Sequence, residues 1–140
     1  MTTISVPINL PNTEVISTMT RDNGDMIVRV KSTETGTCCK SCGKTITKVH
    51  SLNKTLLLNH LPTFGNPVYI ELQPIRFQCF DCESHPTTTQ KLSWYQIEGK
   101  CTELYAKYII NLLVNNTITD VVEQENISYK RVESIIKKFS

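Results

Sequence analysis

Cysteines carry the most specific chemistry of this sequence, and four of its six fall into two equal spacings. Two residues separate Cys39 from Cys42, and two separate Cys79 from Cys82. This spacer lets both thiolates of a pair face one tetrahedral zinc ion, about 2.3 Å from each sulfur. Gly43 follows the first pair, where a tight turn often requires a positive φ. Two such pairs on either side of a strand-rich segment predict a zinc site.

Other interpretations of these residues remain open at this point. Cys38 could replace Cys39, although its spacing to Cys42 is one residue longer, and His85 could replace a thiolate. A redox dithiol would need a βαβ setting, which the sequence does not suggest. With four thiolate ligands the zinc ion has no open position for water or substrate. We therefore expect it to stabilise the fold and not to catalyse a reaction.

Composition and length indicate a folded, soluble protein of one domain or two small ones. The chain has 140 residues, of which 39% are apolar and 20% charged, and its net charge is +2. It has no apolar run of about 20 residues that could span a membrane, and its start does not resemble a secretory signal. Thiols in a protein that is not exported stay reduced, which favours metal binding over disulfides. We expect a cytoplasmic protein.

Two segments have the alternating pattern of β-hairpins, residues 14–33 around an Asp-Asn-Gly-Asp turn and residues 54–79. Pro74 cannot donate a ladder hydrogen bond, so we expect it at a sheet edge or a bulge. Residues 83–100 are polar and show no period. We interpret them as a linker that includes a packed Trp94.

The last segment, residues 101–139, has a helical period. We expect one long helix, then a second that is capped by Thr117 or Thr119. Asn126 is expected in a left-handed turn and Ser128 as the next N-cap. These three helices predict a helix-turn-helix unit.

The predicted fold is α+β, with a β-rich, zinc-ribbon-like domain over residues 1–95 and an all-α helix-turn-helix domain over residues 96–140. The last helix has four basic residues and one acidic residue, which gives a charge of +3. A basic face on this helix is what docking into the DNA major groove requires. Alternatively, the face is only solvated. Candidate DNA contacts in the helix are Tyr129, Lys130, Arg131, Ser134, Lys137 and Lys138, and Arg76 and Lys44 extend the basic surface.

The order of these features resembles the N-terminal region of the ISL-three family of bacterial insertion-sequence transposases. The resemblance rests on Cys39-x-x-Cys42-Gly43, Val49-His50-Ser51, Leu61-Pro62, Gly65, Pro67-Val68, Leu72, Arg76-Phe77 and Cys79-x-x-Cys82. It implies that Cys39, Cys42, Cys79 and Cys82 bind zinc. It also implies that the zinc domain and the helices together recognise the terminal inverted repeats of the element in double-stranded DNA, at the bacterial nucleoid.

The sequence departs from the family pattern in two respects. Ile75 occupies a position where the family commonly has an arginine, and the catalytic domain expected after Ser140 is not in the sequence. The thirteen acidic residues form no recognisable catalytic set. We therefore expect a DNA-binding module that is not an enzyme. A zinc-ribbon adaptor for other proteins and a small transcriptional regulator are the alternatives, and a homodimer is compatible with each.

Overall fold

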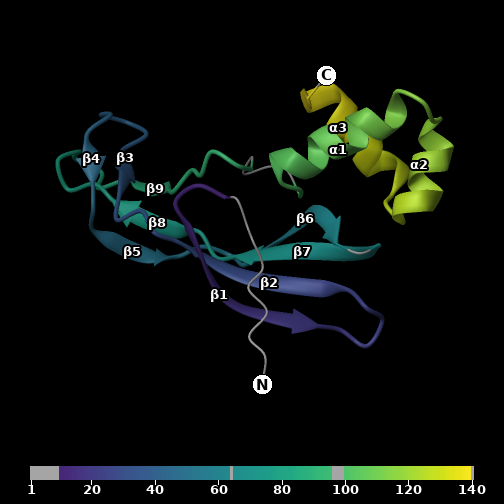
Figure 1. Ribbon diagram of the computed structural model, residues 1–140. Coiled ribbons are helices and arrows are strands. Elements are labelled where there is room, and N and C mark those ends of the chain that lie inside the picture. Colours follow the sequence, from purple (N-terminus) through teal and green to yellow (C-terminus); the bar gives the residue numbers. More distant parts are fainter. Residues whose placement is uncertain (1–9, 64, 96–99, 140) are drawn as a thin grey trace.

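The computed structural model describes residues 10–63, 65–95 and 100–139, which form a mixed α+β fold. A four-stranded sheet occupies the centre, a group of short strands lies at one end, and three helices lie at the other (Figure 1). The strands are β1 (Thr13–Thr20), β2 (Met26–Ser32), β3 (Thr37–Cys38), β4 (Thr45–Ile46), β5 (Val49–Leu52), β6 (Leu56–Thr63), β7 (Asn66–Leu72), β8 (Ile75–Gln78) and β9 (Thr87–Thr89). The helices are α1 (Glu103–Leu113), α2 (Ile118–Glu125) and α3 (Tyr129–Phe139).

Both predicted hairpins are present in the central sheet. The antiparallel pair β1–β2 turns through Gly24, whose φ of 95° suits glycine, and β6–β7 forms the second antiparallel pair. The strand order is β1-β2-β7-β6, because β2 and β7 pair in parallel. This pairing joins strands from opposite sides of the first cysteine pair, and the sequence analysis did not predict it.

The core of the sheet lies on one face, where alternate residues of three strands line up. Val28 pairs with Ile70, which in turn pairs with Leu58, and all three side chains are buried. Leu92, Trp94 and Tyr95 pack over this row and complete the cluster. Burial of these apolar surfaces supplies the main free energy that holds the sheet together.

The interpretation of residues 83–100 as a linker was wrong. β9 pairs with β8, and Trp94 is packed as expected, with its Nε1 donating a hydrogen bond to Thr13 Oγ1 at 2.9 Å. This segment has no regular period in the sequence, because it is polar in β9 and its apolar residues are scattered. Strand β9 was therefore not predicted. Residues 96–99 lie outside the described part of the chain.

The short strands form two small sheets, β3–β4 and β5-β8-β9, around a core that contains the buried Phe77 and Ile46. The expectation for Pro74 also needs correction. It is buried in the connection between β7 and β8, where its carbonyl accepts a hydrogen bond from Asn53 N at 2.8 Å. A residue without an N–H fits here because the chain leaves one sheet and enters another.

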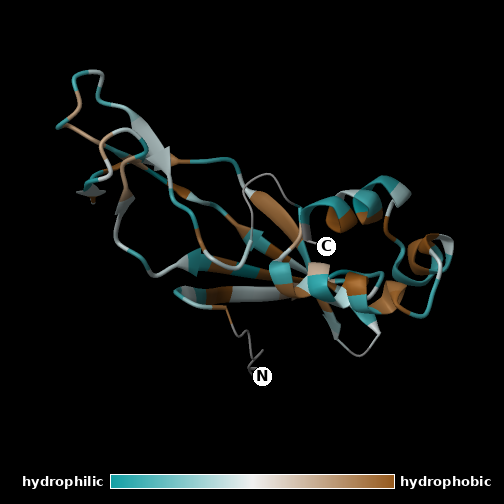
Figure 2. Ribbon diagram, turned by 90° about the horizontal axis from the view of Figure 1, so that it is seen from above, coloured by the Kyte–Doolittle hydropathy of each residue, from teal (hydrophilic) through white to brown (hydrophobic). Residues whose placement is uncertain are grey.

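Helix α2 begins and ends at capping residues that were predicted from the sequence. The Oγ1 of Thr117 accepts from Asp120 N, and the Asp120 carboxylate accepts from Thr117 N, which forms a capping box. Asn126 ends α2 in the left-handed conformation, with φ 52° and ψ 46°. Figure 2 shows hydrophobic and hydrophilic segments alternating along the helices, as in amphipathic helices. None of the described helices is long and apolar enough to cross a membrane.

The helices are attached to the edge strand β6 through Asn59. Its backbone N donates to Lys100 O at 3.0 Å, and its backbone O accepts from Thr102 N at 2.9 Å. Its side-chain Oδ1 accepts from Arg131 Nη1 at 2.6 Å. His60 Nδ1 adds a hydrogen bond of 2.8 Å with Thr102 Oγ1. Hydrogen bonds thus cross the predicted domain boundary between residues 95 and 96.

We expect the substitution Asn126→Ala to lower the free energy of unfolding by about 1 kcal/mol, because an alanine in the left-handed region lacks the local hydrogen bonding of asparagine. Asn126→Gly is the matched control and should be neutral or slightly stabilising, since glycine has no Cβ. Urea denaturation of the two variants and the parent measures both effects. Equal midpoints for all three proteins would contradict this account of the turn.

Candidate metal centre and basic helix

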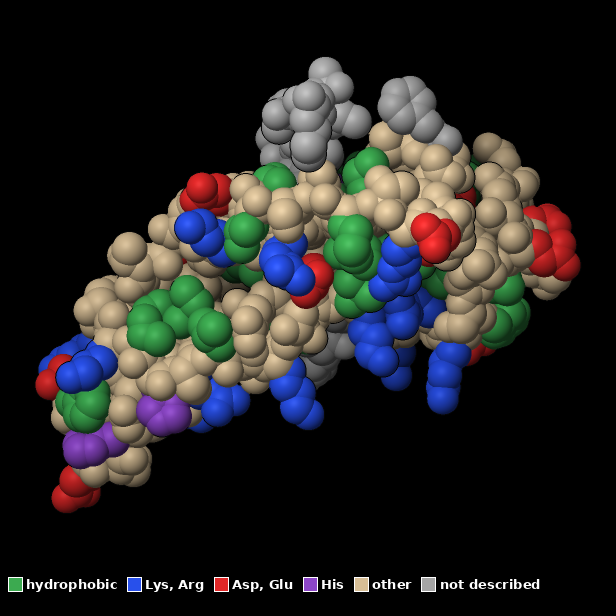
Figure 3. All heavy atoms as spheres, turned by 90° about the horizontal axis from the view of Figure 1, so that it is seen from below, with side chains coloured by type: hydrophobic (Ala, Val, Ile, Leu, Met, Phe, Trp, Pro, Cys, Tyr) green, Lys and Arg blue, Asp and Glu red, His purple; other side chains and the backbone are tan. Residues whose placement is uncertain are grey.

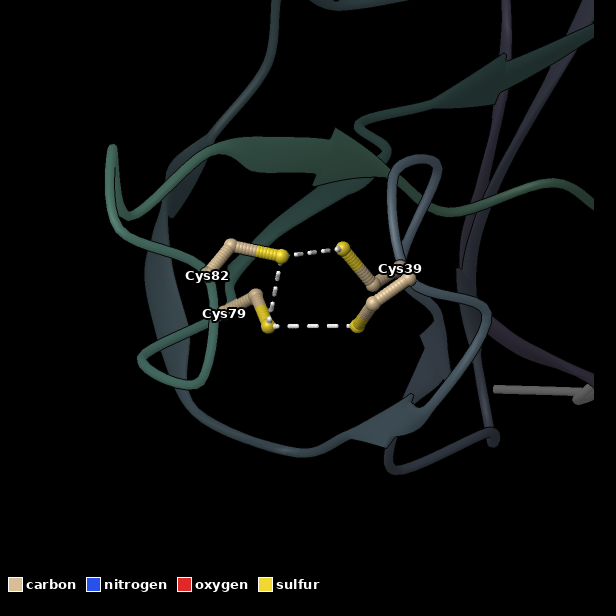
Figure 4. Close-up of side chains that lie close together, drawn as sticks. Cys39, Cys79 and Cys82 are labelled. Carbon is tan, nitrogen blue, oxygen red and sulfur yellow. Dashed lines mark hydrogen bonds between the residues drawn. The ribbon is translucent and has the colours of Figure 1, made fainter.

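Two tight turns bring the cysteine pairs together. In the first, Gly43 N donates to Cys39 O at 2.9 Å, and Gly43 has a φ of 76°, as its position after the pair predicted. In the second, which follows β8, Cys79 N donates to Pro86 O at 3.0 Å. The two turns face each other at the end of the short-strand sheets (Figure 4).

The four sulfur atoms lie at the corners of a site that fits a tetrahedral metal ion. The Sγ–Sγ distances are 3.9 Å for Cys39–Cys82, 3.7 Å for Cys42–Cys79 and 3.8 Å for Cys79–Cys82. All four ligand atoms lie within 4.8 Å of one another. A regular tetrahedron with metal–sulfur bonds of about 2.3 Å has edges of about 3.8 Å, so the donor set already has the size that zinc requires.

The thiols differ in their tendency to ionise. Backbone N–H groups of Cys42 and Ser41, directed at the sulfur of Cys39, lower the pKa of this thiol to about 6. Burial, followed by hydrogen bonds with the other three thiols, raises the pKa of Cys82 to about 12. A bound cation would displace the remaining protons, so metal affinity should fall as the pH falls. Four thiolates leave the metal no open position, so the arrangement suits a structural ion.

The alternative ligands lie outside this cluster. Cys38 is exposed and belongs to β3, and the His85 ring packs against Phe80 with 5.0 Å between the ring centroids. The predicted grouping of the two Cys-x-x-Cys pairs is therefore confirmed, and the identity of the metal stays a prediction.

The predicted polar face of α3 is exposed to solvent. Ser128 Oγ accepts from Arg131 N at 3.1 Å and so begins the helix, while the buried Val132 and Ile135 hold it against the other helices. The candidate contact residues that are exposed are Tyr129, Lys130, Ser134, Lys137 and Lys138. They form a cationic surface on the side of α3 away from the helical core.

Arg131 occupies a different environment from the other candidates on α3. Its side chain is partly buried, and Nη1 donates to Asn59 Oδ1 and, at 3.5 Å, to Lys100 O. The role of Asn59 in attaching the helices was not predicted from the sequence. The only signal was a polar residue within the apolar segment of β6. A DNA contact by Arg131 stays a prediction.

The two candidates outside α3 lie in the short-strand sheets. Lys44 is exposed and lies 3.7 Å from the Asp81 carboxylate, a pairing that in water contributes little to stability. Arg76, on β8, is partly buried and donates to Asn53 Oδ1 at 3.3 Å. The structure does not bring either residue into contact with α3.

We expect the full chain to bind one zinc ion, and Cys42→Ser to abolish stoichiometric binding and to lower the thermal stability. Loss of one thiolate weakens metal binding, and without the metal the two turns are no longer held together. Cys38→Ser is the matched control, because its exposed thiol is one residue from the site but outside it. Elemental analysis and thermal unfolding give the readouts. Full zinc content in Cys42→Ser, or its loss in Cys38→Ser, would show that the ligands are wrongly assigned.

Comparisons of the chain with protein-family models, curated proteins and solved structures found no match. The assignment of function therefore depends on the chemistry of the cysteine cluster and of α3.

Proposed function

We propose that this chain is a zinc-stabilised module that recognises a specific sequence in double-stranded DNA. The observation that carries the proposal is the exposed cationic face of α3, presented after α2 by a left-handed turn at Asn126. This arrangement suits a helix-turn-helix unit whose second helix enters the major groove.

The positions of the side chains on α3 suggest separate roles. Lys130, Ser134 and Lys137 follow a spacing of four and three residues, which places them on one stripe of the helix. The stripe is about 10 Å long, which matches about three base pairs at about 3.4 Å each. Tyr129, Lys130 and Ser134 would contact base edges, and Lys137 and Lys138, in the last turn, would contact phosphates.

In this proposal the cysteine cluster holds zinc and folds a zinc-ribbon-like module, which has no catalytic role. Lys and Arg side chains lie in a row along one margin of the molecule, from the helices toward the short strands (Figure 3). Such a row would attract the phosphate backbone over more than the length of α3.

The resemblance to ISL-three transposases suggests which DNA the module binds. We propose the terminal inverted repeats of an insertion sequence as the target, in the bacterial cytoplasm, and DNA recognition without cleavage by these residues. Capture of sheared bacterial genomic DNA by the zinc-loaded chain, followed by sequencing, tests this. Enrichment of such repeats that is lost with a chelator supports the proposal, and no enrichment at low salt opposes it.

A protein-interaction adaptor is the second candidate, because the edge strand β1 exposes three apolar side chains, Val15, Ile16 and Met19. Exposed edges of this kind are sites where other chains dock. The same surface would also serve a homodimer. The two candidates differ in their dependence on salt, which is steep only for binding to phosphates.

The triple variant with Lys130→Ala, Lys137→Ala and Lys138→Ala should bind duplex DNA more weakly. The slope of log affinity against log salt should become shallower by about 2, because Lys137 and Lys138 contact phosphates in this proposal and about 0.9 is lost for each phosphate contact. The matched control replaces three exposed lysines elsewhere, Lys54, Lys91 and Lys107, by alanine and removes the same charge. Fluorescence anisotropy at several salt concentrations measures both. Equal losses of DNA affinity in the two triple variants would show that α3 has no special role in binding DNA.

A further inference from the structure

The tip of the second cysteine turn exposes an aromatic ring. Phe80 lies between the two metal-binding cysteines of this turn and is 51% exposed. Phe77, three residues earlier, is 1% exposed and packs in the core of the same module. An exposed aromatic ring offers a flat apolar surface on which a planar ligand can stack.

The surroundings of Phe80 hold the ring in place without covering it. Lys48 Nζ lies 5.1 Å from the ring centroid, and the His85 ring lies 5.0 Å away at an angle of 53°. His85 is itself fixed in a left-handed conformation, with its N donating to Cys82 O at 3.0 Å. Gln78 Nε2 donates to His85 O at 3.1 Å. A ring fixed in this way loses little conformational entropy when it binds a planar partner.

Lysines and acidic residues both lie in the two cysteine turns. Lys48 Nζ approaches the Phe80 ring. Lys44 lies 3.7 Å from the carboxylate of Asp81, and Lys40 and Glu83 are exposed. Hydrophobic, histidine, basic and acidic side chains gather at the same end of the molecule (Figure 3). An exposed aromatic ring beside a lysine can bind a nucleobase by stacking and the adjacent phosphate by charge.

We infer that the tip of the cysteine module binds single-stranded DNA, with Phe80 as the stacking platform for an unpaired base. A base inside a duplex has both faces covered by its neighbours, so the ring can stack only on a base that is unpaired or unstacked. The inference rests on the proposed function, since both take DNA as the ligand. It adds a second binding surface whose residues are not those of α3.

The test compares binding of the zinc-loaded full chain to fluorescent oligodeoxythymidine and to a mixed-sequence duplex. Phe80→Ala should weaken binding to the single strand about 5- to 150-fold, the range that loss of one stacked base represents. Its duplex affinity and zinc content should be unchanged. Phe80→Trp should keep the affinity, and its added fluorescence should be quenched by the oligonucleotide, which a purely structural ring would not show. Leu52→Ala, which removes an apolar side chain that is 58% exposed, is the matched control and should change neither affinity.

Four results would overturn the inference. One is single-strand affinity in Phe80→Ala that equals that of the parent. Another is loss of zinc in both variants, Phe80→Ala and Phe80→Leu, which would show that the ring stabilises the folded cysteine module. The third is a parent that binds duplex but not single-stranded DNA, and this leaves the proposed function intact. A parent that binds neither DNA removes both proposals, and the exposed ring is then assigned to a protein partner.

Discussion

Closure of the cysteine cluster constrains the path of the whole chain. The two pairs are 36 residues apart in sequence, yet their sulfurs lie 3.7 to 3.9 Å from one another in three dimensions. The chain between them must therefore leave the module and return to it. It does so as the hairpin β6–β7, which completes the central sheet beside β2. The cysteine cluster and the sheet are thus interwoven, and neither corresponds to one continuous piece of sequence.

Asn59 applies a similar constraint at the other end of the sheet. As an edge strand, β6 has free backbone groups, and the segment before α1 satisfies two of them at this residue. The amide side chain then accepts from Arg131 on α3. One residue of the sheet thereby fixes the start of the first helix and the orientation of the last. Substitutions at Arg131 would disturb this attachment as well as any contact with DNA, which is why the lysines of α3 are the better probes of binding.

The two surfaces considered for DNA lie at opposite ends of the molecule, α3 among the helices and the turn after β8 among the short strands (Figure 1). The central sheet, with its own buried core, lies between them. A ligand that contacted both would have to run along the length of the protein, on the margin where basic side chains gather. A DNA duplex whose strands are unpaired near one end would have this form, with paired DNA at α3 and unpaired DNA at the cysteine module. The separation also makes the two surfaces independent in substitution experiments.

Local patterns in the sequence predicted the two hairpins, the helical segment and the four cysteines of the candidate metal site. Cysteine spacing identified the four thiols, alternation identified the two hairpins, and Thr117, Asn126 and Ser128 predicted the ends of the helices, because turns and caps depend on neighbouring residues. Only the tertiary structure decided the parallel pairing of β2 with β7, the place of β9, and the packing of residues 92–95 over the sheet. These depend on contacts between distant segments whose own sequences have no distinctive period. The attachment of Arg131 to Asn59 belongs to the same class, since one hydrogen bond between residues 72 positions apart leaves no trace in either local sequence.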